Sequence, residues 1–406
     1  MKPPAKSLSI VEFVVMLSMI VSIVALSTDV MLPGLDIIGH DLGVADPKDV
    51  QLIVLFLFIG FSAGQVIAGP LSDSFGRKPV VYGGYLLFFA GCLLSIFAED
   101  FSTMLAGRIL QGLGAAGPRV VTLALVRDCY EGRAMARIMS FVMAVFILVP
   151  AIAPMIGLGL IKISGWRATF VMLLFMSLIA CLWFAVRQPE TLPVASRRPL
   201  SVTNILSGLR QACGYPATLG YTLAAGLIFG AFLGYLSSAQ QIFAVAYDVH
   251  DLFAIYFGTA ALAIGAGSIV NSRLVMKLGM RPLTGWALIG VTSISVLFLI
   301  PAFAMEGVPP LWLLMIWMMI TFFCMGMIFG NINALAMEPL GHLAGLGAAF
   351  VGSVTTLISL PLAWMIGASF EGGVMPLVSG FAFYGFASLL VMNITEKKRT
   401  SVESVK

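Results

Sequence analysis

The chain has 406 residues, of which 60% are hydrophobic and 10% are charged, and its formal net charge is +4. A soluble domain carries roughly 25% charged residues, so this composition excludes a water-soluble globule and predicts a protein dissolved in a lipid bilayer. Long apolar runs also exclude a transmembrane β-barrel, in which apolar and polar residues alternate.

Polar breaks divide the chain into twelve apolar segments, each suited to a membrane-spanning helix of about 20 residues. We therefore predict an all-α polytopic membrane protein with twelve transmembrane helices. The first segment follows two lysines, as in a signal peptide, but no cleavage site follows promptly and we expect the span to be retained. The predicted spans are 10–37, 50–72, 79–98, 101–126, 136–162, 166–187, 216–246, 251–276, 281–304, 309–336, 341–369 and 374–394.

The longest break separates the spans into two groups of six. Such a layout is common among secondary transporters that are built from internal repeats. We predict an N-terminal six-helix bundle at 1–187, a cytoplasmic linker at 188–215, and a C-terminal six-helix bundle with a cytoplasmic tail at 216–406.

The distribution of Lys and Arg predicts the orientation of these spans, because cytoplasmic loops are enriched in both residues. If the N-terminus is cytoplasmic, 18 of the 23 basic residues fall in cytoplasmic segments. Only Lys48, Lys162 and Arg167 fall in outer loops. We therefore expect both termini to lie in the cytoplasm.

Asp29, in the first span, is a candidate proton-binding residue. Ionisable groups inside a membrane are costly and are functional hypotheses by default. The carboxyl group lies in the outer half of a long predicted helix, where the loss of water disfavours its charged form. The alternative is an interfacial carboxylate near the outer end of the span, where Pro33 breaks the helix.

Arg108 and Arg119 lie on one face of the fourth predicted span. Arg108 is too deep to reach the surface easily, so it needs a carboxylate or carbonyl partner, and Asp29 is one candidate. The alternative is that each arginine extends toward one membrane surface. Gly112 and Gly114 allow a neighbouring helix to approach this span closely.

Other polar or helix-breaking residues inside the spans are weaker candidates. Pro150 and Pro154 predict kinks in the fifth span, although kinks are also common in ordinary packing. The neighbouring Gly157 and Gly159 permit tight helix packing there. Four amide side chains are candidates for the lining of a cavity, namely Gln111, Gln240, Asn331 and Asn333.

The stretch GPLSDSFGRKP, residues 69–79, joins the second and third predicted spans. Gly76 suits a tight turn, and Gly69 suits close helix packing. Asp73 is placed to cap the positive N-terminal end of a facing helix. Arg77 and Lys78 match the basic character of cytoplasmic loops. The alternative interpretation is an ordinary charged loop.

A degraded copy of this stretch lies between the eighth and ninth predicted spans, in GSIVNSRLVMKLGMRPL. Gly267 and Asn271 there have the same spacing as Gly69 and Asp73 in the first copy. Gly279, Arg281 and Pro282 follow. The copy occupies the equivalent loop of the second half, as an internal repeat predicts.

These motifs resemble those of the major facilitator superfamily. GPLSDSFGRKPVV resembles its signature loop, and LAGRILQGLGAA resembles its fourth-span motif at Arg108, Gln111, Gly112 and Gly114. APMIGL matches the superfamily's antiporter motif only in part. STDVMLPGL and MEPLGHLAGLGAAFVGS resemble the Bcr/CflA branch of drug:proton antiporters. The resemblance covers about residues 8–394.

The resemblance implies proton-driven export of small lipophilic drugs, such as chloramphenicol- or bicyclomycin-like compounds, across a bacterial inner membrane. It also implies alternating access of two bundles around a central cavity. The coupling site would consist of Asp29 and Arg108. From the polar residues inside the spans, we expect the substrate cavity to include Asp29, Arg108, Gln111, Arg119, Gln240, Asn331 and Asn333. Conformational gating would involve Gly69, Asp73, Gly76, Arg77, Lys78, Pro150 and Pro154.

Other functional classes have less support in the sequence. Export or import of one physiological metabolite is an alternative to drug export. A sensor would need a soluble output domain, for which the termini and the linker are too short. An enzyme is not expected, because His40, His250 and His342 are scattered. We expect a monomer whose partners are the drug, protons and the bilayer, with no cofactor, metal or nucleic acid.

Overall fold

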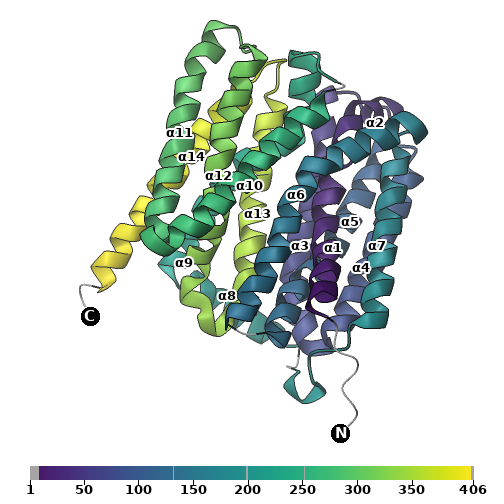
Figure 1. The fold of residues 1–406 in the computed structure, drawn as a ribbon, viewed down its shortest axis with the longest axis vertical. Coiled ribbons are helices and arrows are strands. Elements are labelled where there is room, and N and C mark those ends of the chain that lie inside the picture. The colour runs from purple at the N-terminus through teal and green to yellow at the C-terminus, as the bar shows by residue number, and fades with distance from the viewer. Residues whose placement is uncertain (1–8, 131, 198–199, 251, 404–406) are drawn as a thin grey trace. The chain divides into compact units, whose positions relative to one another are not determined.

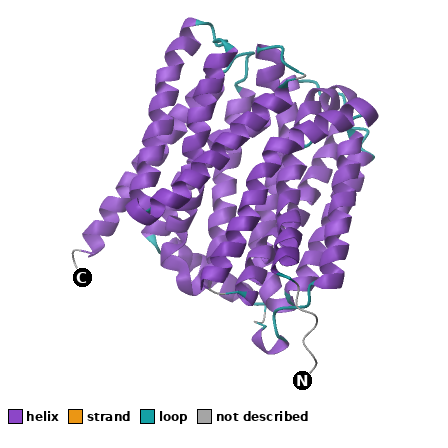
Figure 2. Cartoon of the chain, in the orientation of Figure 1, coloured by secondary structure: helices purple, strands orange, loops and turns teal. Residues whose placement is uncertain are grey.

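The computed structural model describes residues 9–130, 132–197, 200–250 and 252–403. The described residues form helices, loops and turns, and no strand occurs among them (Figure 2). Within them, eleven helical segments are long and apolar enough to cross a membrane. The molecule is therefore a multi-pass helical membrane protein.

The contacts divide the chain into two compact units. The first comprises residues up to Gly34, Asp41–Gly43 and Phe56–Val202. Its long helices run side by side in Figure 1. They are α1 (Ile10–Asp29), α3 (Leu52–Phe75), of which the first turn belongs to the second unit, α4 (Arg77–Ile96), α5 (Phe101–Cys129), α6 (Gly132–Ser164) and α7 (Arg167–Arg187).

The first predicted span is interrupted rather than continuous. Its helix, α1, ends at Asp29, and a 3₁₀ turn at Leu32–Gly34 leads into the short helix α2 (Leu35–Asp41). Pro33 lies inside the turn and has no backbone N–H to continue the helical hydrogen bonds. The interruption therefore places Asp29 at the C-terminal end of a helix, where backbone carbonyl groups lack helical partners.

The fifth predicted span corresponds to α6, which is helical throughout Gly132–Ser164. Among its described residues, the apolar stretch is the shorter segment Leu148–Ser164. Pro150 and Pro154 lie inside this helix. The exact total of twelve spans stays a prediction.

The second unit comprises Leu35–His40, Val44–Leu55 and Thr203 onward. The division at residues 202 and 203 lies within the segment 188–215. The unit contains most of α8 (Val202–Cys213), a π-helical turn at Ile242–Ala246, and six long helices. These are α9 (Pro216–Gln241), α10 (Phe253–Leu278), α11 (Met280–Ala304), α12 (Leu311–Met337), α13 (Ala344–Ala368) and α14 (Met375–Glu403).

The same helix pairings occur within each unit. In the first unit α4 packs along α5, α1 packs against α6, and α4 contacts α7. In the second unit α11 packs along α12, α9 packs against α13, and α11 contacts α14. The third helix of each half thus pairs with the fourth and sixth, and the first pairs with the fifth. Matched pairings of this kind are what an internal structural repeat produces.

Glycines mark an equivalent helix crossing in each unit. A Cβ atom added at Gly112 in α5 would lie 1.9 Å from the backbone oxygen of Leu57 in α3. A Cβ atom added at Gly326 in α12 would lie 2.1 Å from the backbone oxygen of Ile264 in α10. Any side chain would separate these backbones, so the close approach predicted at Gly112 is confirmed.

Candidate functional site

Asp29 is buried within the first unit, with 3% of its surface exposed. It is the last residue of α1. Among the described residues, its carboxyl group makes no hydrogen bond and no ion pair. A buried ionisable group without a protein partner must bind a proton, water or a ligand to avoid the cost of burying a bare charge.

Arg108 on α5 is fully buried, and its guanidinium holds the end of α1. Nη2 donates to the backbone oxygen of Ser27 at 2.8 Å, and Nη1 donates to Oε1 of Gln111 at 2.5 Å. The guanidinium also lies 5.8 Å from the ring centroid of Phe170 on α7, within the range of a cation–π interaction.

The partner of Arg108 is therefore a carbonyl group rather than the carboxylate of Asp29. The described residues show no hydrogen bond or ion pair between Arg108 and Asp29. The reason is that α1 ends at Asp29. The carbonyl of Ser27 belongs to the last turn, which has unsatisfied acceptors and a partial negative charge. A cation near that carbonyl stabilises the helix end next to Asp29.

Gln111 links this arrangement to α4. Its Nε2 donates to Oγ of Ser95 at 3.2 Å and approaches Sγ of Cys92 at 3.7 Å. The helices can come this close because a Cβ atom added at Gly91 would lie 2.6 Å from the backbone oxygen of Gly107. The packing of α4 on α5 therefore fixes the position of the Arg108 guanidinium.

Gly157 on α6 contacts the chain directly after Asp29. A Cβ atom added at Gly157 would lie 1.8 Å from the backbone oxygen of Val30. The predicted tight packing is confirmed at Gly157. At Gly159, a Cβ atom would meet nothing within 4 Å, so the same prediction is wrong there.

Replacement of Gly157 by alanine is expected to displace α6 from the end of α1. Overpacking of this kind costs about 1–3 kcal/mol, so the melting temperature of the purified protein should fall and transport should decrease. Gly159→Ala on the same helix is the matched control and should resemble the wild type. Equal stability and transport in the two variants would contradict the assigned packing.

Arg119 lies on α5 beyond the fully buried part of the site. Its guanidinium is 5.8 Å from the ring centroid of Phe146 on α6. Its side chain is partly exposed, whereas that of Arg108 is buried. The two arginines therefore have different surroundings, although they share one helical face.

A second polar cluster lies at the loop between α3 and α4. Gly76 has φ +104°, so the predicted tight turn is confirmed. Arg77 follows, and its Nη1 pairs with Oδ1 of Asp73 at 2.7 Å. Its Nε pairs with Oδ2 of Asp128, at the end of α5, at 2.9 Å. The buried Arg77 side chain thus connects the ends of α3, α4 and α5.

Glu190, which follows α7, caps the N-terminus of α4. Its carboxylate accepts hydrogen bonds from the backbone N–H groups of Arg77 at 2.9 Å and Lys78 at 3.0 Å. Asp73 was predicted to cap a facing helix, and it pairs with Arg77 instead. Partial burial raises the pKa of Glu190, but the backbone N–H donors outweigh this effect and leave the pKa below its ordinary value.

Glu190→Ala is expected to destabilise the first unit by about 1 kcal/mol at neutral pH, the typical effect of losing a helix cap. Because the pKa of Glu190 is depressed in the folded protein, its stabilisation is present above the ordinary pKa of about 4.3 and is lost at lower pH. Denaturant unfolding at several pH values should show this difference shrink below about pH 4. Glu99→Ala, at an exposed acid, is the control, and a Glu190→Ala variant as stable as this control at pH 7 would contradict the cap.

The equivalent loop of the second unit has a related arrangement. Gly279 has φ +82° and precedes α11. Arg281 pairs with Glu338, which follows α12, and with Glu396 of α14 at 3.1 Å. In both units, a glycine with positive φ is followed within two residues by an arginine, and this arginine contacts a carboxylate at the end of the fourth helix. The Asp73 position is Asn271 here, and its amide exchanges two hydrogen bonds with Asn331.

The remaining predicted cavity residues lie in the second unit. Asn331 is buried in the amide pair just described. Asn333 is exposed and donates to the backbone oxygen of Phe329 in its own helix. Gln240 is buried near the end of α9 and donates to Asp36. The structure therefore does not bring these three amides into direct contact with one another.

Sequence reasoning missed three residues of the two loop clusters. Asp128 and Glu190 bind the Arg77–Lys78 segment, and Glu396 binds Arg281. Asp128 lies two residues beyond the predicted span 101–126, and a carboxylate at that place could have been considered as a partner for the basic loop residues. No local pattern indicated the other two, because their partners are more than 100 positions away in the chain.

A multi-pass helical fold, repeated helix pairings and a buried carboxyl group beside an arginine-bound helix end characterise this chain. The family model described as Major Facilitator Superfamily matches residues 9–363. The chain belongs to this superfamily and is therefore a membrane transporter.

Curated relatives agree with this assignment and with the predicted branch. The chain is 30% identical to the uncharacterised MFS-type transporter YdgK of Bacillus subtilis, with 87% of each protein covered. It is 28% identical to a bicyclomycin resistance protein homolog of Haemophilus influenzae, covering 84% of this chain and 85% of the relative. It is 30% identical to a chloramphenicol resistance protein of Pseudomonas aeruginosa, and the match covers 86% of this chain and 84% of the relative. The resemblance to Bcr/CflA-type proteins is confirmed.

A solved structure shows the same fold. The partially occluded, inward-open xylose transporter XylE of Escherichia coli superposes with a TM-score of 0.75. The comparison covers 96% of this chain and 97% of that chain, at 14% sequence identity. At this identity the likeness concerns the fold alone.

Proposed function

We propose that the protein is a proton-coupled exporter of small lipophilic drugs in the bacterial inner membrane. Support comes from relatives named for resistance to bicyclomycin and chloramphenicol. The observation that carries the proton-coupling part is the buried carboxyl group of Asp29, which lacks a protein partner among the described residues. Both termini are proposed to be cytoplasmic, and the transporter is proposed to act as a monomer.

Asp29 is the proposed proton carrier. The carboxyl group takes a proton when the site is open to the outside and releases it when the site is open to the cytoplasm. Arg108 is not the carrier, because a guanidinium keeps its proton. Its bonds to the Ser27 carbonyl and to Gln111 position the helix end that presents Asp29.

Drug binding is proposed to use the polar candidates in both units, which are Asp29, Arg108, Gln111, Arg119, Gln240, Asn331 and Asn333. Alternating access would expose this set to one side of the membrane at a time. The pairing of Arg77 with Asp73 and Asp128 is the proposed gating contact, since it joins three helix ends. Gly69, Gly76, Lys78, Pro150 and Pro154 are proposed to support the same movement.

A resistance panel tests this proposal. The chain is expressed in an efflux-deficient bacterial host, and growth is measured against chloramphenicol, bicyclomycin and sulfonamides, with and without a protonophore. We expect increased resistance to several drugs, together with protonophore-sensitive drug efflux. The empty vector is the control. No change in resistance to any drug would contradict drug export and favour transport of one physiological metabolite.

A further inference from the structure

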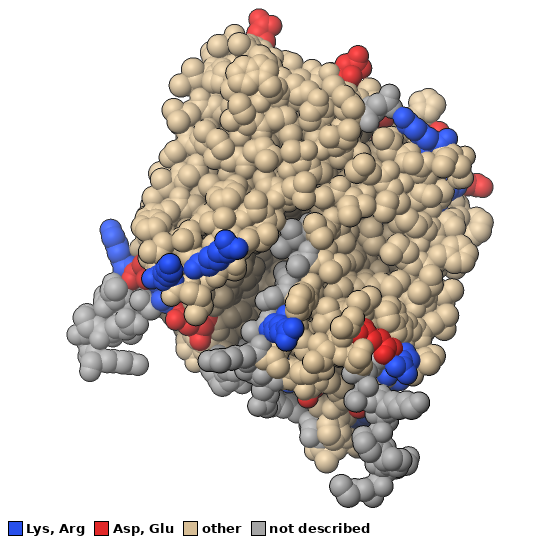
Figure 3. Space-filling view, viewed as in Figure 1, with Lys and Arg blue, Asp and Glu red and all other residues tan. Residues whose placement is uncertain are grey.

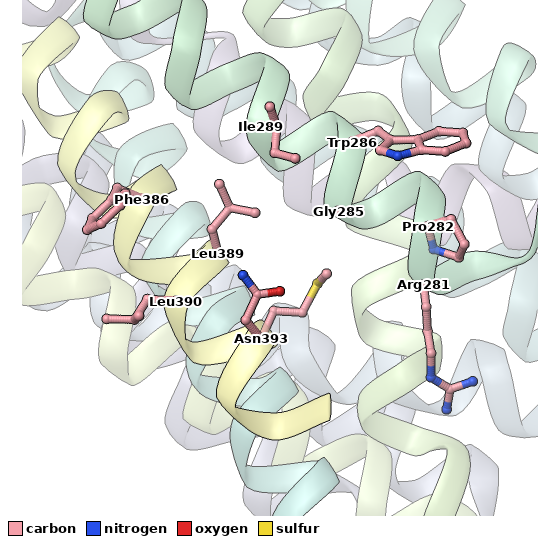
Figure 4. Close-up of a pocket in the computed structure, with 10 residues that line it drawn as sticks. Arg281, Pro282, Gly285, Trp286, Ile289, Phe386, Leu389, Leu390 and Asn393 are labelled. Carbon is pink, nitrogen blue, oxygen red and sulfur yellow. The ribbon is translucent and has the colours of Figure 1, made fainter. Parts of the chain in front are cut away.

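A groove lies between α11 and α14 on the membrane-facing side of the second unit. It has a volume of about 350 Å³. Figure 4 shows Leu389 and Asn393 of α14 pointing toward α11, with Gly285 on the opposite wall. Trp286 and Phe386 line the same groove and are 57% and 59% exposed. Because both helices are apolar candidate spans, the groove opens toward lipid.

Gly285 leaves part of the groove wall without a side chain. A Cβ atom added there would meet only the Cε atom of Met392, at 3.2 Å. The end of a methionine side chain moves easily, so a larger residue at this position would occupy the groove without pushing the two backbones apart. Gly285 is therefore a position at which the groove can be filled selectively.

One end of the groove is polar. Arg281 and Asn393 line that end, which lies near the start of α11. The Asn393 amide is exposed and makes no hydrogen bond with the described residues. The indole N–H of Trp286 likewise makes no hydrogen bond with the described residues. Polar groups at a lipid-facing surface need partners, so these donors require a ligand or water.

The charges around the polar end favour an anion. Figure 3 shows basic side chains over the lower ends of α10, α11 and α14, with acidic side chains beside them, below an uncharged surface. The described residues in this region include four basic side chains and two carboxylates, so the region has two more positive than negative charges. The basic residues are Arg273, Lys277, Arg281 and Lys397, and the carboxylates are Glu338 and Glu396. Lys397 lies one helical turn beyond Asn393 on the same face of α14.

We propose that this groove binds an anionic diacyl glycerophospholipid. One acyl chain lies along Trp286 and Phe386. The phosphate lies at the polar end, where the Asn393 amide donates a hydrogen bond and Lys397 supplies positive charge. An apolar groove that ends in an amide and an excess of cations matches the two parts of such a lipid. The proposal does not depend on which drug is exported.

Native mass spectrometry of the purified full-length protein tests the proposal. The protein is titrated with phosphatidylglycerol and, separately, with phosphatidylcholine of the same acyl chains. We expect the wild type to retain one phosphatidylglycerol molecule more tightly than any phosphatidylcholine. Lys397→Ala should weaken this retention by about fivefold, the effect of one basic residue near an anionic lipid surface.

Gly285→Leu is the critical variant because it fills the groove, and it should lose the retained phosphatidylglycerol. Gly83→Leu is its matched control. Gly83 lies on α4, the equivalent helix of the first unit, and an added Cβ atom there meets nothing within 4 Å. Melting temperatures close to that of the wild type establish that both variants are folded.

Three results would overturn the proposal. The first is unchanged phosphatidylglycerol retention in a folded Gly285→Leu variant. The second is equal retention of phosphatidylglycerol and phosphatidylcholine by the wild type, which would remove the role of charge. The third is a wild-type dimer that Gly285→Leu converts to a monomer, because a second copy of the chain would then occupy the groove.

Discussion

Replacement of Asp29 by asparagine is expected to abolish proton-coupled drug export while the protein stays folded. Asparagine has nearly the same shape but cannot take up or release a proton. Because the wild-type carboxyl group is buried without a partner among the described residues, removing its charge also removes a cost of burial. The variant should therefore melt at the wild-type temperature or above it, although resistance falls to the empty-vector level.

Drug efflux from loaded cells and drug-induced proton movement in inverted membrane vesicles measure this effect. Asp49→Asn is the matched control, since Asp49 is an exposed acid in the 3₁₀ turn Pro47–Gln51 before α3. It should export drug as the wild type does. Wild-type resistance and proton movement in Asp29→Asn would show that the coupling proton is carried elsewhere.

The second large effect is expected at Arg108. Its replacement by alanine leaves the Ser27 carbonyl and the Gln111 side chain without their donor. An unsatisfied buried polar group costs about 1–3 kcal/mol, so both stability and transport should fall. Asp29→Asn is expected to lose transport alone, and this contrast separates a proton carrier from a positioning residue.

Arg108→Lys refines the test. Lysine keeps the charge but lacks the planar fork that reaches two acceptors at once, so we expect partial recovery of stability and slow transport. Arg119→Ala is a comparison for stability alone, because the described contact of Arg119 is with one aromatic ring and the residue is itself a proposed drug-binding residue. Full activity and wild-type stability of Arg108→Ala would exclude the proposed positioning of α1.

The two loop clusters show how a repeated arrangement diverges. In the first unit, Arg77 is paired with two aspartates at the ends of α3 and α5. In the second unit, Asn271 replaces the α3 aspartate and forms an amide pair with Asn331. An amide pair carries no net charge, so it is less sensitive to pH and salt than an ion pair. The second loop keeps an ion-paired arginine, because Arg281 binds Glu338 and Glu396. Only the first loop pairs its arginine with the residue at the Asp73 position.

Local patterns in the sequence predicted much of the architecture. The apolar segments determined where most helices begin and end, because only helices satisfy their own backbone groups in lipid. The α9 helix begins at the predicted residue 216, and α7 ends at the predicted residue 187. The turn at Gly76 was predicted because glycine tolerates positive φ, and Gly279 adopts positive φ at the equivalent place in the second unit.

The predictions that failed concerned partners of polar groups. The carboxylate of Asp29 was a reasonable partner for Arg108, but the carbonyl of Ser27 occupies that place. Asp73 was expected to cap a helix, a role that Glu190 fills. No partner was predicted for Arg167, which donates to the backbone oxygens of Ile96 and Ala98 at and just after the end of α4. Each partner comes from a distant helix or loop.

The amino-acid sequence by itself determined that this chain is a multi-pass helical membrane protein with an internal repeat and a buried acid in its first span. These properties depend on composition, on spacing and on the solvation of single residues, all of which are local. The tertiary structure alone decided what each buried polar group contacts. That choice depends on which helix ends meet, and close approach at glycines such as Gly157 and Gly112 sets those meetings.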